Sequence, residues 1–81
     1  MKIERMTKGD WGNCKALFTV KTQEGVIIDN FKLIEKHDGS MFMGLPSRKN
    51  KQDEWENSIR FEDKEKRIEL EKTAMEHYEY A

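Results

Sequence analysis

Four side chains that follow the single proline are the ones in this sequence best suited to chemistry. Pro46 is followed directly by Ser47, Arg48 and Lys49, and Lys51 lies two positions further on. A hydroxyl and three cations held on the stiff exit from a strand can contact phosphate oxygens and neutralise their charge. Cations in a polar loop are usually plain solvated charge, and a serine there more commonly closes a turn. The residues alone therefore favour a solvated turn, with phosphate binding as the functional alternative.

A second basic group, formed by Lys64, Lys66 and Arg67, lies near the start of an expected C-terminal helix. A helix N-terminus favours anions, which mutes cations placed there. Asp63 stands four residues before Arg67, at the spacing of a helical ion pair. Lys66 and Arg67 are candidates for phosphate contacts, and a solvated, salt-bridged helix surface is the alternative.

The two tryptophans suit stacking on unpaired bases, a contact worth about 1–3 kcal/mol per base. Trp11 lies in a cluster of turn formers, Gly9 to Asn13, and is expected to be the more exposed of the two. Trp55 is expected instead to anchor the core or a dimer interface, because a small chain needs large apolar side chains to close its core.

Nothing in the sequence points to catalysis. His37 and His77 lie far apart and neither has a nucleophile or a carboxylate pair at a known spacing. Glu76 beside His77 fits a polar helix face better than a metal site. The sequence contains no glycine-rich phosphate loop, and Cys14 is its only cysteine. We therefore expect a binding module rather than an enzyme, with no cofactor and no metal.

Length and composition limit the size of the core and the ways in which the fold can be stabilised. The 81 residues fit one domain with one small core, and a lone cysteine cannot form an internal disulfide, so burial against a second copy is the remaining aid to stability. Fifteen Lys and Arg nearly cancel sixteen Asp and Glu, for a net charge of −1. Binding to nucleic acid must then depend on local charge. No apolar run is long enough for a membrane span or a signal peptide, so we expect a cytoplasmic protein. Because burial against a second copy is the remaining aid to stability, we expect that protein to be a homodimer.

Alternating apolar residues predict the strands that position these groups. A short first strand over 2–6 and a loop over 9–13 are expected, followed by a strand from Cys14 with Ala16, Phe18 and Val20 on one face. Gln23-Glu24-Gly25 predicts a hairpin turn with a residue at positive φ. The next strand, 26–35, carries Asp29-Asn30 at its middle, which predicts a bulge or a bend.

The second half of the chain is expected to end the sheet and add a helix. Asp38-Gly39 predicts a turn, 41–45 a short strand that Pro46 ends, and 47–56 a polar loop, with a last short strand around Ile59 and Phe61. From about residue 62 the period becomes helical, with Asp63 as a possible N-cap. One arc of that helix is expected to pack on the sheet, namely Ile68, Leu70, Ala74, Met75 and Tyr78. The predicted fold is α+β: a small antiparallel sheet of about four to five strands with a C-terminal helix packed on it.

The order of these segments resembles the SpoVG family of small bacterial stage V sporulation or septation regulators. The most specific match is 39–49, an apolar strand that runs into Pro-Ser and two basic residues. Residues 15–20 and 26–35 look like the family's second and third strands, and 70–78 like its closing helix.

The resemblance implies homodimers that join sheets across the subunit interface, and binding of DNA and RNA in septation- or sporulation-type gene regulation. The candidate nucleic-acid-binding residues are then Ser47, Arg48, Lys49, Lys51, Lys66 and Arg67. The alternative hypothesis is a protein interaction module or adaptor that keeps the fold but has lost nucleic-acid binding, because the acidic stretch 53–65 has abandoned phosphate contacts.

Overall fold

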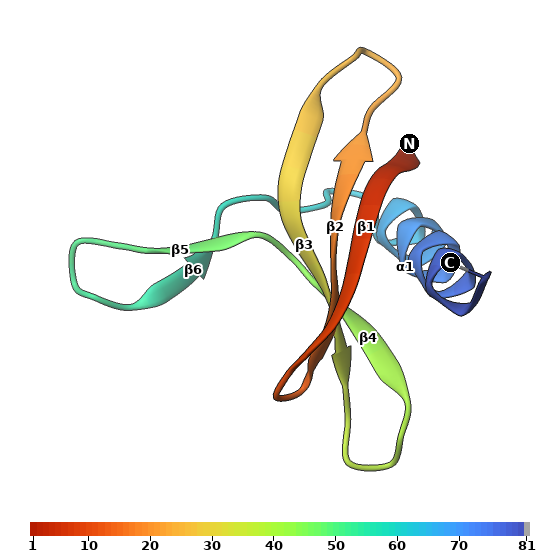
Figure 1. Ribbon diagram of the computed structural model, residues 1–81. Coiled ribbons are helices and arrows are strands. Elements are labelled where there is room, and N and C mark those ends of the chain that lie inside the picture. The colour runs from red at the N-terminus through yellow and green to blue at the C-terminus, as the bar shows by residue number, and fades with distance from the viewer. Residues whose placement is uncertain (81) are drawn as a thin grey trace.

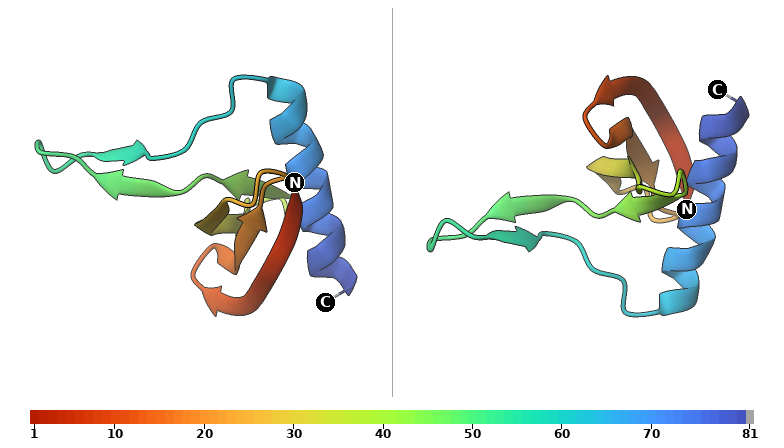
Figure 2. Two further views of the ribbon diagram at one scale, coloured as in Figure 1. Left: turned by 90° about the horizontal axis from the view of Figure 1, so that it is seen from above. Right: turned by 90° about the horizontal axis from the view of Figure 1, so that it is seen from below.

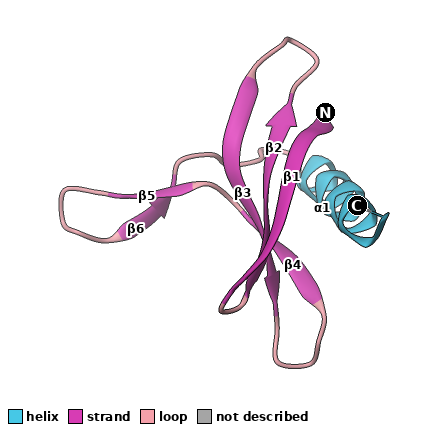
Figure 3. Ribbon diagram, viewed as in Figure 1, coloured by secondary structure: helices cyan, strands magenta, loops and turns pink. Residues whose placement is uncertain are grey.

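The computed structural model describes residues 1–80 and has six strands and one helix (Figure 1). The elements are β1 (Lys2–Trp11), β2 (Cys14–Lys21), β3 (Ile27–Glu35), β4 (Met41–Gly44), β5 (Ser47–Lys49), β6 (Trp55–Asn57) and α1 (Lys64–Tyr80). The first four strands form one antiparallel sheet in the order β1-β2-β3-β4, and β5 and β6 form a separate antiparallel pair. The α+β prediction, a small sheet followed by a C-terminal helix, is confirmed (Figure 3).

The first strand is longer than its sequence predicts. β1 stays paired with β2 as far as Trp11 opposite Cys14, so Gly12 and Asn13 alone form the turn, with Gly12 at φ 66°. The expected loop over 9–13 is therefore wrong for Gly9 to Trp11 and confirmed for Gly12 and Asn13. Gly9 and Asp10 lie at an irregularity of the ladder, where two residues of β1 face Lys15 alone, and they remain extended because pairing resumes at Trp11. Tertiary context here outweighs local propensity.

The bulge predicted at Asp29-Asn30 is confirmed. Phe18 pairs with Phe31 and Val20 with Ile28, so two residues of β3 face Thr19 alone. Asn30 adopts φ 72°, and the Thr19 hydroxyl donates to Asp29 Oδ1 at 2.8 Å. The extra residue keeps Phe31 on the core side of the sheet, because without it the side-chain alternation would be out of phase with β2.

The two predicted glycine turns also form. Gly25, at φ 90°, closes the β2–β3 turn, and Gly39, at φ 88°, closes the β3–β4 turn. Asp38 Oδ1 accepts from the Ser40 backbone N–H at 2.9 Å and from its hydroxyl at 2.6 Å, and these bonds lower the Asp38 pKa. A carboxylate with a lowered pKa adds stability above its unfolded pKa, and that contribution is lost as the pH falls through its folded pKa.

A second exposed carboxylate is paired beside the β1–β2 turn. The Lys15 ammonium donates to Asp10 Oδ1 at 2.8 Å. This hydrogen bond lowers the Asp10 pKa and raises the Lys15 pKa. The Asp10 contribution to stability is therefore also lost in acid, and the Lys15 contribution is lost as the pH rises through its raised pKa.

The core lies between the sheet and one face of α1 (Figure 2). Its buried apolar side chains come from β2, β3, β4 and α1: Ala16, Phe18, Val20, Phe31, Leu33, Met43, Leu70 and Ala74. The rings of Phe18 and Phe31 stack with centroids 5.3 Å apart. The prediction that Ala16, Phe18 and Val20 share the core face is confirmed.

The helix begins as its sequence predicts. Asp63 Oδ1 accepts from the Glu65 backbone N–H at 2.9 Å, the hydrogen bond of an N-cap. Leu70 and Ala74 are buried, but Ile68 is half-exposed, so its expected place in the packed arc is wrong. Ile68 lies at the edge of that arc, where the helix surface turns away from the sheet.

Candidate nucleic-acid interface

The segment after Pro46 is a β-hairpin, which we call the arm (residues 47–57). Ser47 pairs with Asn57, Arg48 with Glu56 and Lys49 with Trp55. A polar loop was predicted over 47–56 and a last strand around 59–61, and both predictions are wrong. β6 comes earlier, and residues 58–63 form an irregular connection to α1.

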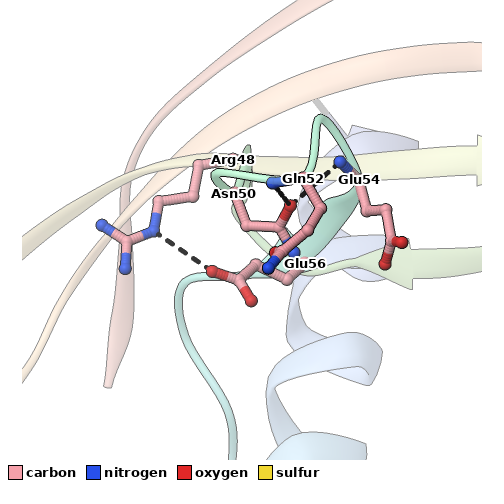
Figure 4. Close-up of polar contacts among 5 residues, drawn as sticks. All are labelled: Arg48, Asn50, Gln52, Glu54 and Glu56. Carbon is pink, nitrogen blue, oxygen red and sulfur yellow. Dashed lines mark hydrogen bonds and ion pairs between the residues drawn. The ribbon is translucent and has the colours of Figure 1, made fainter.

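The turn of the arm is closed by one side chain (Figure 4). Asn50 Oδ1 accepts from the backbone N–H groups of Gln52 at 2.9 Å and Glu54 at 3.0 Å. The Asn50 N–H donates to the Glu54 carbonyl at 2.8 Å, and Asp53 adopts φ 62° within the turn. Asparagine commonly closes turns in this way, because its side-chain oxygen replaces a backbone acceptor. The strands are thereby held in register with few apolar contacts.

The arm extends away from the helix and the core (Figure 2). Its root is fixed by the buried Pro46, whose carbonyl accepts from the Ser58 N–H at 2.8 Å. Proline ends β4 as predicted, since it has no N–H for the ladder. The chain continues extended beyond it, so the cations stand on a projecting ribbon rather than on a loose loop.

Each strand-borne cation of the arm has an acidic neighbour. Arg48 Nε lies 3.8 Å from Glu56 Oε1, directly across the ladder. Lys49 Nζ lies 3.5 Å from Asp53 Oδ1 and 5.6 Å from the centre of the Trp55 ring. Lys51 is exposed, at the turn. Arg48, Lys49, Asn50, Lys51 and Glu56 line a shallow open hollow.

These ion pairs are weak enough to open. The Arg48 side chain is 74% exposed and that of Lys49 is 53% exposed, and exposed pairs contribute about 0–1 kcal/mol. Three cations and three acids, Asp53, Glu54 and Glu56, give the arm a formal charge of zero. An incoming phosphate must therefore compete with carboxylates that already lie beside Arg48 and Lys49.

Trp55 lies on the arm and not in the core. It is 68% exposed, so the expectation that it anchors the core is wrong. The hairpin register explains this placement, since it puts Trp55 opposite Lys49 on a ribbon with no core beneath it.

Lys66 and Arg67 form a separate group. Both are exposed in the first turns of α1, and Lys66 borders a surface hollow with residues of the β2–β3 turn, including Thr22 and Glu24. The arm projects away from this helix (Figure 2), so the six predicted residues fall into two groups rather than one site. The expected Asp63–Arg67 ion pair is not among those of residues 1–80, because Asp63 caps the helix instead.

Sequence reasoning missed Glu56 and Asn50 as parts of this surface. Glu56 faces Arg48 only because of the hairpin register. The sequence of the arm has no alternation of apolar residues from which this register could be predicted. Asn50 followed by polar residues and then Trp55, a good strand former, was the available signal for a hairpin here.

The described part of the chain, residues 1–80, places no group of three His, Cys, Asp or Glu side chains where they could hold a metal ion. Within the same range, no helix has both the length and the apolar character needed to cross a membrane.

Comparison with protein families gives one finding that covers the whole described chain. The family model SpoVG matches residues 1–80. Comparison with curated proteins and comparison with solved structures gave no significant match.

Proposed function

The chain belongs to the SpoVG family, and we propose that it is a nucleic-acid-binding regulatory protein that acts in septation- or sporulation-type gene regulation in the cytoplasm. In this proposal it is a binding module and not an enzyme. DNA or RNA is the partner, and the arm supplies phosphate contacts.

The observation that carries this proposal is the geometry of the arm. Arg48, Lys49 and Lys51 stand on a projecting hairpin whose root at Pro46 is fixed by packing and by a backbone hydrogen bond. Cations on a rigid ribbon lose less freedom on binding than cations on a mobile loop, and the exposed carboxylates that neighbour them are easily displaced. The hydroxyl of Ser47 lies at the base of the same ribbon and can donate to a phosphate oxygen.

The double variant Arg48→Ala/Lys49→Ala tests this proposal. Affinity for DNA and RNA is expected to fall about tenfold at low salt, and the dependence of log K on log salt to become shallower by about two, because two phosphate contacts are lost. A fluorescence anisotropy titration at several salt concentrations measures both quantities.

The matched control is Lys64→Ala/Lys72→Ala, which removes the same charge from the exposed surface of α1. It is expected to retain most of the affinity. A folded wild-type protein that binds neither DNA nor RNA at low salt contradicts the proposed function.

The ion pairs of the arm favour a second candidate function, a protein interaction module. If Glu56 and Asp53 stay paired with Arg48 and Lys49 when phosphate is present, the arm offers a neutral surface with an exposed tryptophan. Such a surface suits a protein partner. Binding of purified protein to nucleic acid separates the two candidates directly.

We also propose that the protein is a homodimer joined through a sheet edge. The sheet has two edges, β1 and β4. At β4 the Met43 N–H already donates to Glu71 Oε2 of α1 at 2.9 Å, so that edge is partly occupied. The ten-residue β1 is the longer edge, and a long unpaired strand is a template for pairing with another chain. Sedimentation at micromolar concentration is expected to give a dimer, and a clean monomer contradicts this proposal.

A further inference from the structure

The face of the four-stranded sheet opposite α1 is the feature on which this inference depends, and we call it the open face. Side chains alternate along each strand, so the residues that flank the core positions point away from the helix. Strand register and the lining of one hollow place these side chains there: Arg5, Thr7, Trp11, Leu17, Lys32 and Phe42. The α1 helix covers only the other face (Figure 2).

The Trp11 indole packs on the open face over Gly9, which has no side chain to displace it. A Cβ atom on Gly9 would lie 2.4 Å from Cη2 of the indole, so the ring lies directly over the glycine and occupies the space of a side chain. Trp11 is nevertheless 50% exposed. The indole therefore has one side against the sheet and the other open to solvent, which is the arrangement a base needs for stacking.

Next to the indole is a shallow hollow with polar groups on its rim. It is lined by β1, β2 and β3, with Arg5, Thr7 and Leu17 beside Trp11. Asp29 is the one acidic residue in its lining, and its carboxylate accepts the hydrogen bond from the Thr19 hydroxyl. The Arg5 guanidinium, the Thr7 hydroxyl and the Asn30 amide are thus available around the Trp11 ring.

A second aromatic stands on the opposite edge strand of the same face. Phe42 pairs with Ile34, and the Lys36 ammonium lies 5.5 Å from the centre of the Phe42 ring. Lys32 pairs with Gly44, which leaves room for the Ile34 side chain. β1 and β4 are three strand spacings apart, about 14 Å, so Trp11 and Phe42 can contact different nucleotides of one strand.

The charge of the open face complements an anion. Register adds Lys2 and Lys21, which pair with each other across β1 and β2, to Arg5, Lys32 and Lys36. The arm is neutral, whereas these five cations are distributed along the open face from the Lys2–Lys21 pair to Lys36, with Asp29 as the one acid in the lining of the hollow.

We propose that the open face is a platform for single-stranded DNA or RNA, on which bases stack on Trp11 and Phe42 while the surrounding cations contact phosphates. The proposal rests on the proposed function and adds the form of nucleic acid and the surface that binds it. Unpaired bases have free faces for aromatic rings, whereas the bases of a duplex are stacked on each other and inaccessible to a flat surface.

Trp11→Ala tests the platform, with Tyr80→Ala as its matched control, because both aromatic side chains are at least half-exposed, neither belongs to the core, and Tyr80 lies on α1 outside the arm and the open face. Affinity for a labelled oligothymidylate is expected to fall about 5- to 150-fold in Trp11→Ala, and to change little in Tyr80→Ala. Gly9→Ala displaces the indole without removing it and is expected to weaken binding in the same direction. Wild-type protein is expected to bind the single strand more tightly than its duplex with oligoadenylate.

The outcomes separate this inference from the proposed function. Wild-type protein that prefers the duplex, or Trp11→Ala that binds the single strand as wild type does, overturns the platform and leaves a nucleic-acid-binding protein. Wild-type protein that binds no nucleic acid overturns the proposed function itself. If Trp11→Ala instead converts a dimer to a monomer in sedimentation, a second copy covers the open face and the platform is overturned.

Discussion

Phe31→Ala is expected to lower the free energy of unfolding by about 3–5 kcal/mol, at the upper end of the losses for truncating a core side chain. Phe31 is fully buried, stacks on Phe18 and follows the bulge that keeps it on the core side. Alanine removes the stacked ring and leaves a cavity under α1 that a small core has few other side chains to fill. Since domains of this size have about 5–15 kcal/mol in total, a large fraction of the variant is expected to be unfolded near its working temperature. Urea denaturation followed by circular dichroism measures the change.

Ile27→Ala is the matched control for this variant, because Ile27 lies in the same strand and is 49% exposed. Its expected cost is below about 1 kcal/mol. Equal losses in the two variants would contradict the assignment of the core to the helix-covered face.

The sequence was most informative where burial and turn chemistry agree. In β2 and β3 the core residues recur at every second position, and glycines stand where the backbone requires positive φ, so those strands, their turns and the bulge could be predicted. The end of β1 could not, because Gly9 to Trp11 are extended only through pairing with β2. The arm escaped prediction for a related reason: its strands bury almost nothing, and its register is set by the side-chain bonds of Asn50.

The candidate site also has a part that residue types predict and a part that depends on the fold. A basic segment after Pro46 follows from residue types alone, but whether its cations are free depends on which acids lie across the ladder. Glu56 meets Arg48 only in the folded hairpin. The open face depends even more on the fold, since Trp11 and Phe42 lie 31 positions apart in sequence and share a surface only because β1 and β4 are the two edge strands of one sheet.

The remaining prediction concerns the acids of the arm. Asp53→Asn/Glu56→Lys changes the formal charge of the arm from zero to +3 and removes both carboxylates that neighbour Arg48 and Lys49. Asparagine suits position 53, where φ is 62° and asparagine is among the residues that tolerate the left-handed region. Affinity for nucleic acid at low salt is expected to rise about 10- to 100-fold, and the salt dependence to steepen, because the freed and added cations make new phosphate contacts.

The control Glu76→Gln/Glu79→Lys makes the same change of +3 on the exposed surface of α1, away from the arm. A similar rise in both variants would mean that only net charge matters and that the arm is not a contact surface. If instead the arm variant gains no affinity while wild-type protein binds, the arm stands clear of the nucleic acid and the open face carries binding alone. The pair of variants therefore decides whether Asp53 and Glu56 reduce the affinity of the arm for phosphate. The structure puts each of these acids beside a cation that a phosphate would contact.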